Sequence, residues 1–186
     1  MAIKTFSSGE VLTASDTNTY LANAGLVYVA GASFTAQTTV DITGISSTYK
    51  MYRLEYTARR VDTAGTAAAT AQFRSSTTAQ ASGYYYGGIY ANYLGATGSL
   101  VAGNNQASAW FPAADSFGAQ SPCAFDICID QAVSASWHGT LYFAGGAFWG
   151  GYAGACTTSL TLDRLRVTYT SGTCTGYWRL YGYREP

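Results

Sequence analysis

Apolar and polar residues alternate along most of the chain after Gly25. In the clearest example, residues 49–59, the apolar face carries Tyr52, Leu54, Tyr56 and Ala58. A period of two residues is typical of a half-buried β-strand. Related patterns predict strands at 67–73, 121–130, 137–143, 160–170 and 177–184, with shorter ones near 27–30, 38–42, 84–93 and 107–111.

Turn-forming residues separate these segments. Glycine and small polar residues cluster at 63–65, 95–98, 103–105 and 145–146, and such clusters are typical of turns. No repeat of fixed period occurs, which argues against a β-helix or a propeller. Eight to ten antiparallel strands therefore predict an all-β, two-sheet sandwich of the jelly-roll type. Within 160–170 the apolar phase shifts between Leu162 and Leu165, which predicts a β-bulge near 163–164.

The first 25 residues have a different pattern. Thr13 is a suitable helix N-cap, and Asp16 occupies the capping-box position, where a carboxylate is also favoured by the helix dipole. Gly25 suits the C-cap, and the apolar points of the helix are Leu12, Tyr20, Leu21 and Ala24. A helix of about ten residues is unstable alone, so it must dock on its own domain or on a neighbouring chain. The pattern divides the chain into an arm, residues 1–25, and a β-domain, residues 26–186.

Charge is low and balanced. Ten basic residues offset ten acidic ones, and charged residues make up only 11% of the chain, against about 25% in an average domain. This composition gives no electrostatic case for nucleic acid or an anionic membrane as partner, and it favours association between protein surfaces. No apolar run approaches the roughly 18 residues of a membrane span. The first residues lack the apolar region of a secretory signal, so we expect synthesis in a cytoplasm and no membrane insertion.

Residues that could carry catalysis are few. His138 is the only histidine, and it falls in mid-strand opposite Trp137, where a surface or hydrogen-bonded role is the usual one. Asp126 and Asp130 share a strand face but lie about 13 Å apart at a rise of about 3.3 Å per residue. Glycosidases need about 5–9.5 Å between their two carboxyl groups. With no GxSxG, HExxH or CxxC motif, we expect no enzyme, no cofactor and no metal site; a polysaccharide hydrolase is the least favoured hypothesis.

The four cysteines form no CxxC pair. Cys123 and Cys128 point to opposite faces of one strand and should not bond to each other. Free, mostly buried thiols are the expectation for a cytosolic product. The sequence leaves open whether Cys156 and Cys174 form a disulfide.

Aromatic residues gather in two segments, 83–93 and 144–152. Tyrosines on both faces of one strand cannot all enter a single core, and tyrosine combines apolar area with a hydroxyl group. Three interpretations stay open: ordinary core, a subunit interface, and an aromatic platform for sugars. The candidate residues are Tyr84, Tyr85, Tyr86, Tyr90, Tyr93, Phe148, Trp149 and Tyr152.

Two stretches resemble proteins of tailed-phage virions. Residues 6–21, FSSGEVLTASDTNTYL, resemble an N-terminal segment of tail fibres and related appendages, which reads Phe-x-x-Gly-Glu-x-Leu-Thr-Ala, then an acidic residue, then Asn and an aromatic or aliphatic residue. Residues 162–182 are similar to the closing hairpin of many such proteins, in which a strand rich in Ile, Arg and Leu precedes a Ser-Gly turn and a strand ending in Leu-Tyr-Gly. The middle of the chain, 26–160, carries no such resemblance.

The resemblance implies a non-enzymatic virion component, often a homotrimer, whose N-terminal segment attaches it to capsid or tail proteins while the β-domain projects outward. The implied attachment residues are Phe6, Leu12, Thr13, Asp16, Tyr20 and Leu21. The chain is short for a long fibre and has no shaft-like repeat, which favours a short appendage or a capsid-decorating cement protein. The alternative is a receptor-binding tail-fibre module that recognises a host-surface glycan. Either function places the protein in the virion.

Overall fold

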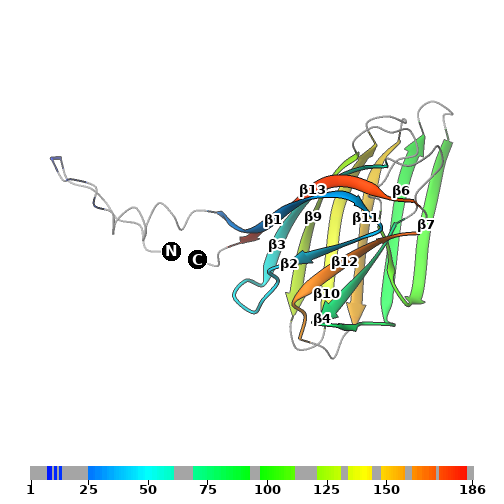
Figure 1. Ribbon diagram of the computed structural model, residues 1–186, viewed down its shortest axis with the longest axis horizontal. Helices are drawn as coiled ribbons and strands as arrows, with labels where there is room; N and C mark the ends of the chain where they lie inside the picture. Colours follow the sequence, from blue (N-terminus) through cyan, green and yellow to red (C-terminus); the bar gives the residue numbers. More distant parts are fainter. Residues whose placement is uncertain are drawn as a thin grey trace.

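The computed structural model describes residues 8–9, 11, 13, 25–60, 69–92, 97–111, 121–130, 134–143, 148–157, 161–170 and 172–183. These residues form thirteen β-strands and no helix (Figure 1). None of the described segments is a helix long and apolar enough to cross a membrane. The expected all-β class and the two antiparallel sheets are confirmed.

The larger sheet has eight antiparallel strands. In spatial order they are β1 (Leu26–Gln37), β13 (Cys174–Tyr183), β3 (Met51–Arg60), β9 (Ser121–Asp130), β10 (Ser134–Phe143), β11 (Phe148–Thr157), β6 (Tyr84–Asn92) and β7 (Thr97–Gln106). The strands β9, β10 and β11 follow one another along the chain. By contrast, β13 lies between β1 and β3, so strands from the two ends of the β-domain are direct neighbours.

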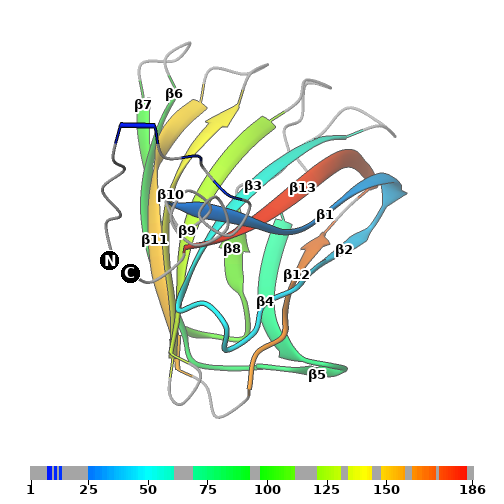
Figure 2. The same cartoon turned by 90° about the vertical axis from the view of Figure 1, so that its left-hand side faces the viewer.

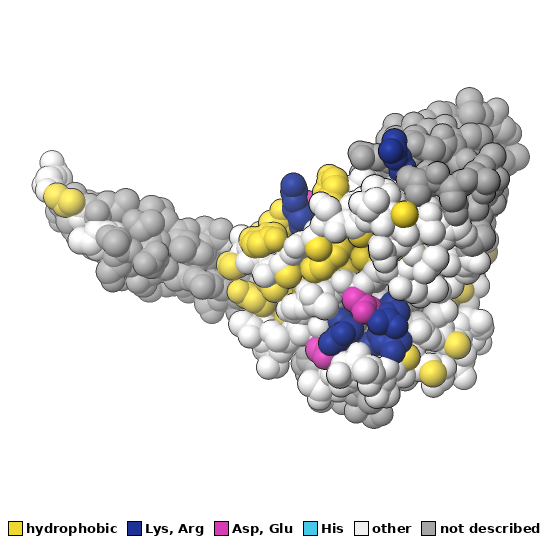
Figure 3. Space-filling view, viewed as in Figure 1, with side chains coloured by type: hydrophobic (Ala, Val, Ile, Leu, Met, Phe, Trp, Pro, Cys, Tyr) yellow, Lys and Arg dark blue, Asp and Glu magenta, His cyan; other side chains and the backbone are white. Residues whose placement is uncertain are grey.

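The smaller sheet is ordered β2 (Thr39–Thr43), β12 (Arg164–Tyr169), β4 (Ala69–Ser75) and β5 (Thr78–Ala79), and β8 (Ala109–Phe111) also pairs with β4. Its outer face carries ion pairs, which Figure 3 shows as charged side chains gathered over β2 and β12. Arg166 binds both carboxylate oxygens of Asp41, at 2.6 and 2.7 Å. This hydrogen bonding holds the pKa of Asp41 below its usual value.

The two sheets face each other (Figure 2). The apolar side chains between them form one core. On β3, Tyr52, Leu54, Tyr56 and Ala58 are fully buried, as their alternation predicts. The hydroxyl groups of Tyr56 and Tyr169 meet at 2.5 Å, which joins β3 of the larger sheet to β12 of the smaller one. The rings of Trp137 and Phe73 make a second contact between the sheets, with centroids 5.8 Å apart.

Two local predictions are wrong. Residues 97–98 of the turn expected at 95–98, and the whole turn expected at 103–105, lie in β7. Strand pairing with β6 outweighs the weak strand preference of glycine and asparagine there. Residues 95–96 lie outside the described part of the chain. The expected bulge at 163–164 does not exist, since β12 begins only at Arg164. Leu162 is buried but lies before the strand, and the backbone N–H of Asp163 donates to the carbonyl of Arg74. The shift of apolar phase therefore marks the start of a strand.

The predicted helix of the arm lies almost wholly outside the described residues. Of its residues, Thr13 is described and exposed, and Gly25 has a φ of +101°, the left-handed conformation that a C-cap glycine adopts. Phe6, Leu12, Asp16, Tyr20 and Leu21 are outside the described part of the chain. The division into an arm and a β-domain stays a prediction.

Candidate functional site

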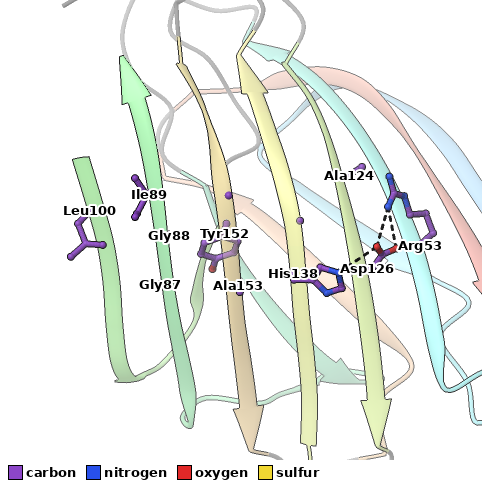
Figure 4. A pocket seen from close by; sticks show the side chains of 12 residues that line it. Arg53, Gly87, Gly88, Ile89, Leu100, Ala124, Asp126, His138, Tyr152 and Ala153 are labelled. Carbon is purple, nitrogen blue, oxygen red and sulfur yellow. Dashed lines mark hydrogen bonds and ion pairs between the residues drawn. The ribbon is translucent and has the colours of Figure 1, made fainter. Parts of the chain in front are cut away.

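The outer face of the larger sheet is hollowed into a shallow trough of about 830 Å³ (Figure 4). Side chains alternate between the two faces of a strand, so residues next to the buried ones in sequence point away from the smaller sheet. The trough crosses six strands, from β3 at one end to β7 at the other. Its lining differs at the two ends, charged near β3 and apolar near β7.

Strand register builds the trough from residues far apart in the sequence. Arg53 pairs with Asp126, Asp126 with His138, and His138 with Ala153. Ala153 in turn pairs with Gly87. One row therefore runs across five neighbouring strands on a single face, and it places the only histidine of the chain beside an Asp–Arg pair.

The charged end centres on Asp126. Its carboxylate accepts hydrogen bonds from Arg53 Nη1 at 3.0 and 3.2 Å and from the Tyr183 hydroxyl at 2.8 Å. His138 Nε2 lies 3.6 Å from Asp126 Oδ2 (Figure 4). The Asp126 side chain is 18% exposed, whereas that of His138 is 72% exposed. Burial, followed by the hydrogen bond to Asp126, raises the pKa of Tyr183. The carboxylate is thus held in place by surrounding donors, while the imidazole is open to a ligand.

Small residues make the floor of the trough, among them Gly87, Gly151 and Ala153. A Cβ atom added to Gly151 would meet nothing within 4 Å, and at Gly87 only the carbonyl of Val101 at 3.9 Å. Packing inside this chain therefore requires glycine at neither position. Glycine within a strand costs roughly 0.5–1 kcal/mol relative to alanine and often marks a place where another molecule approaches closely.

Ile89 and Leu100 form the apolar end of the trough. They face each other across β6 and β7, and they are 66% and 75% exposed. The whole arrangement offers a fixed acceptor, an exposed imidazole and an apolar wall along one open floor. That combination suits binding of a ligand with both polar groups and an apolar face. Within the described residues, no three His, Cys, Asp or Glu side chains come together to hold a metal ion.

The tyrosine-rich segment is divided between core and surface. Tyr85 is 43% exposed, and Tyr86 is half-buried with its ring 6.0 Å from that of Tyr152. Tyr84 and Tyr152 are buried in the core, and Tyr152 also contributes to the lining of the trough. Tyr90, Phe148 and Trp149 belong to β6 and β11, but their side chains lie outside the described part, as does all of Tyr93.

A specific hydrogen bond explains why Tyr84 turns inward. Its hydroxyl accepts from the backbone N–H of Phe73 at 2.7 Å and so satisfies a buried donor of the smaller sheet. Burial raises the pKa of Tyr84 and that of the neighbouring Cys156, the latter to about 11. Cys156 is free and buried, Cys128 is free and exposed, and Cys174 is buried. Cys156 is therefore a protonated, structural thiol at neutral pH.

Sequence reasoning singled out His138 and Asp126 but did not connect them with each other or with Arg53. The signal was present in part, since all three fall on the polar faces of their strands. The pairing of β3, β9 and β10 then brings the three residues side by side, and the sequence alone does not show this register. No protein-family model and no curated protein matches the chain.

Proposed function

We propose that this chain is a structural component of a bacteriophage virion, a short appendage or decoration protein. Its arm, residues 1–25, anchors it to capsid or tail proteins, and its β-domain, residues 26–186, projects outward. The observation that carries the proposal is the resemblance of residues 6–21 to an N-terminal segment of tailed-phage virion proteins.

The strand order supports a jelly roll, a fold that capsid domains use. In a jelly roll, the two halves of the chain run antiparallel and their successive strand pairs fall alternately into two sheets. Here the pairs are β1 with β13, β2 with β12, β3 with β9, and β4 with β5 and β8. The first and third lie in the larger sheet, the second and fourth in the smaller. On this interpretation β10, β11, β6 and β7 extend the larger sheet beyond the jelly roll.

The surface around β1, the strand that follows residues 1–25 in the sequence, also supports attachment. Leu26 and Tyr28 open β1 directly after the arm, and both are exposed. Figure 3 shows apolar side chains gathered over β1 and β13 on this side of the domain. Exposed apolar area that continues from an arm suits contact with a neighbouring virion protein.

Deleting residues 1–25 tests the proposal. We expect the remaining β-domain to keep its β-sheet circular dichroism and its cooperative unfolding, because the residues of the described core all lie within 26–186. We also expect it to be absent from purified particles when it replaces the full-length chain during phage growth. Full-length protein produced in the same way is the control. A truncated chain that enters particles at the normal level would contradict the anchoring role of the arm.

The trough favours a second candidate function, binding of a host-surface glycan by the same domain. A sugar ring combines hydroxyl groups with an apolar face, and the trough places His138 and Asp126 opposite Ile89 and Leu100.

For this candidate we expect full-length protein to bind on an array of bacterial-surface oligosaccharides. His138→Ala should weaken binding about tenfold, the value of roughly one hydrogen bond to the ligand. Ser136→Ala is the matched control, because Ser136 is exposed on the same strand and is not part of the trough lining. An array without binding, or equal binding by His138→Ala, would remove the glycan function.

A further inference from the structure

β7 forms one edge of the larger sheet (Figure 2). One side of the strand pairs with β6. Among the described residues, no strand pairs with its other side. An unpaired strand edge presents a row of backbone donors and acceptors that another strand can satisfy.

Along residues 97–103, this edge lacks the usual protection against pairing. Natural edge strands carry charges, proline or bulges, or they are short. The ten residues of β7, TGSLVAGNNQ, contain no charge and no proline. The pairing with β6 is regular from Thr97 to Gly103, and its single register shift lies beyond this run, opposite Tyr84–Tyr86. The opposite edge strand, β1, differs because its pairing with β13 shifts register twice. β7 shifts register once, near its C-terminal end, where Asn105 has a φ of +51°.

Apolar side chains stand at this same edge. Leu100 is 75% exposed although it lies in the middle of the regular run, and its cross-strand neighbour Ile89 is 66% exposed. Two large aliphatic side chains, side by side at an uncharged sheet edge, leave apolar area in water next to unpaired backbone groups.

We propose that β7 pairs antiparallel with β7 of a second copy, about a two-fold axis at Leu100. Leu100 is the central residue of the regular run 97–103, so this register pairs Thr97 with Gly103, Gly98 with Ala102, and Leu100 with its own copy. Directly opposite residues share a face in an antiparallel pair. The two copies therefore form a continuous apolar strip, Ile89–Leu100 from one copy followed by Leu100–Ile89 from the other.

The two-fold arrangement follows from the edge itself. It needs one surface only, used twice, and it pairs the regular strand with an equally regular one. A head-to-tail contact would instead pair β7 with β1, whose register shifts twist the backbone away from a regular ladder. This inference concerns the chain in solution and does not depend on the proposed role in a virion.

Introducing a charge at Leu100 tests the contact between the two copies of β7. We expect full-length protein to form a concentration-dependent dimer by light scattering after size-exclusion chromatography. Leu100→Lys and Leu100→Glu should each weaken dimerisation about a hundredfold or more, because each puts two like charges opposite each other and removes the buried leucines. Mixing the two variants should restore the dimer, since the opposite charges then meet. Ser136→Lys, at another exposed site on the interior strand β10, is the control and should leave the dimer intact.

Circular dichroism and thermal unfolding of each variant check that the fold is kept. Three results would overturn the proposal: a full-length protein that is monomeric at about 100 µM; an oligomer, trimeric or otherwise, that both Leu100 variants leave unchanged; or mixed variants that stay monomeric although each is folded. The last result would place Leu100 at a contact without two-fold pairing. None of these measurements depends on entry into the particle, so this inference and the proposed function can fail separately.

Discussion

Replacing Trp137 by alanine is expected to lower the free energy of unfolding by about 3–5 kcal/mol. Trp137 is buried, and its ring lies 5.8 Å from that of Phe73, 6.3 Å from Tyr84 and 6.3 Å from Tyr152. Phe73 belongs to the smaller sheet and the other two residues to the larger one. The substitution therefore opens a cavity at a point where the two sheets are held together. Its cost includes both the lost burial and the unfilled space.

Urea unfolding followed by circular dichroism measures this loss. Trp137→Phe should cost less than Trp137→Ala, because a phenyl ring keeps part of the contact with Phe73. Ser136→Ala changes the neighbouring exposed residue on the same strand and should have little effect. A loss below about 1 kcal/mol for Trp137→Ala, the size expected at an ordinary position, would show that the ring does not join the sheets.

Gly176→Ala is expected to destabilise the domain by about 3 kcal/mol. Gly176 on β13 pairs with Ala58 on β3. A Cβ atom at this position would collide with the carbonyl oxygen of Thr57 and lie 2.9 Å from the Cα of Ala58. Both neighbours are backbone atoms of a central strand, so they cannot move aside as the end of a flexible side chain would.

Gly151→Ala provides the matched control for this prediction. Gly151 also lies within a strand of the larger sheet and has no positive φ, but an added Cβ would meet nothing within 4 Å. We expect alanine here to be neutral or to stabilise by up to about 1 kcal/mol, because it lowers the entropy of the unfolded chain. Equal effects of the two substitutions in thermal and urea unfolding would contradict the packing described around Gly176.

Local sequence patterns identified most of the strands and their buried faces. The faces of β3 and β4 were predictable because burial repeats every second residue, from Tyr52 to Ala58 and from Ala69 to Phe73. β7 was missed because Gly98, Gly103 and Asn104 are turn residues by composition, and only pairing with β6 makes them a strand. Local preference decides less in a sheet than the neighbouring strand does.

The trough could not be predicted from the sequence for a related reason. It depends on the register of Arg53 with Asp126 and of Asp126 with His138, which joins residues separated by 73 positions in the first case. No periodicity within one strand encodes such a register. Alternation did place all three side chains on polar faces, so the face was predictable and the cluster was not.

The pairing of β1 with β13 and of β2 with β12 also constrains how the protein is made. A ribosome releases β1 and β2 early, yet their partners β13 and β12 leave the exit tunnel much later. Pairs so distant in sequence form slowly, and until they form, the apolar side chains of the early strands are exposed to other nascent chains. This domain should therefore fold after synthesis and benefit from a chaperone that shields its first strands until the last ones arrive.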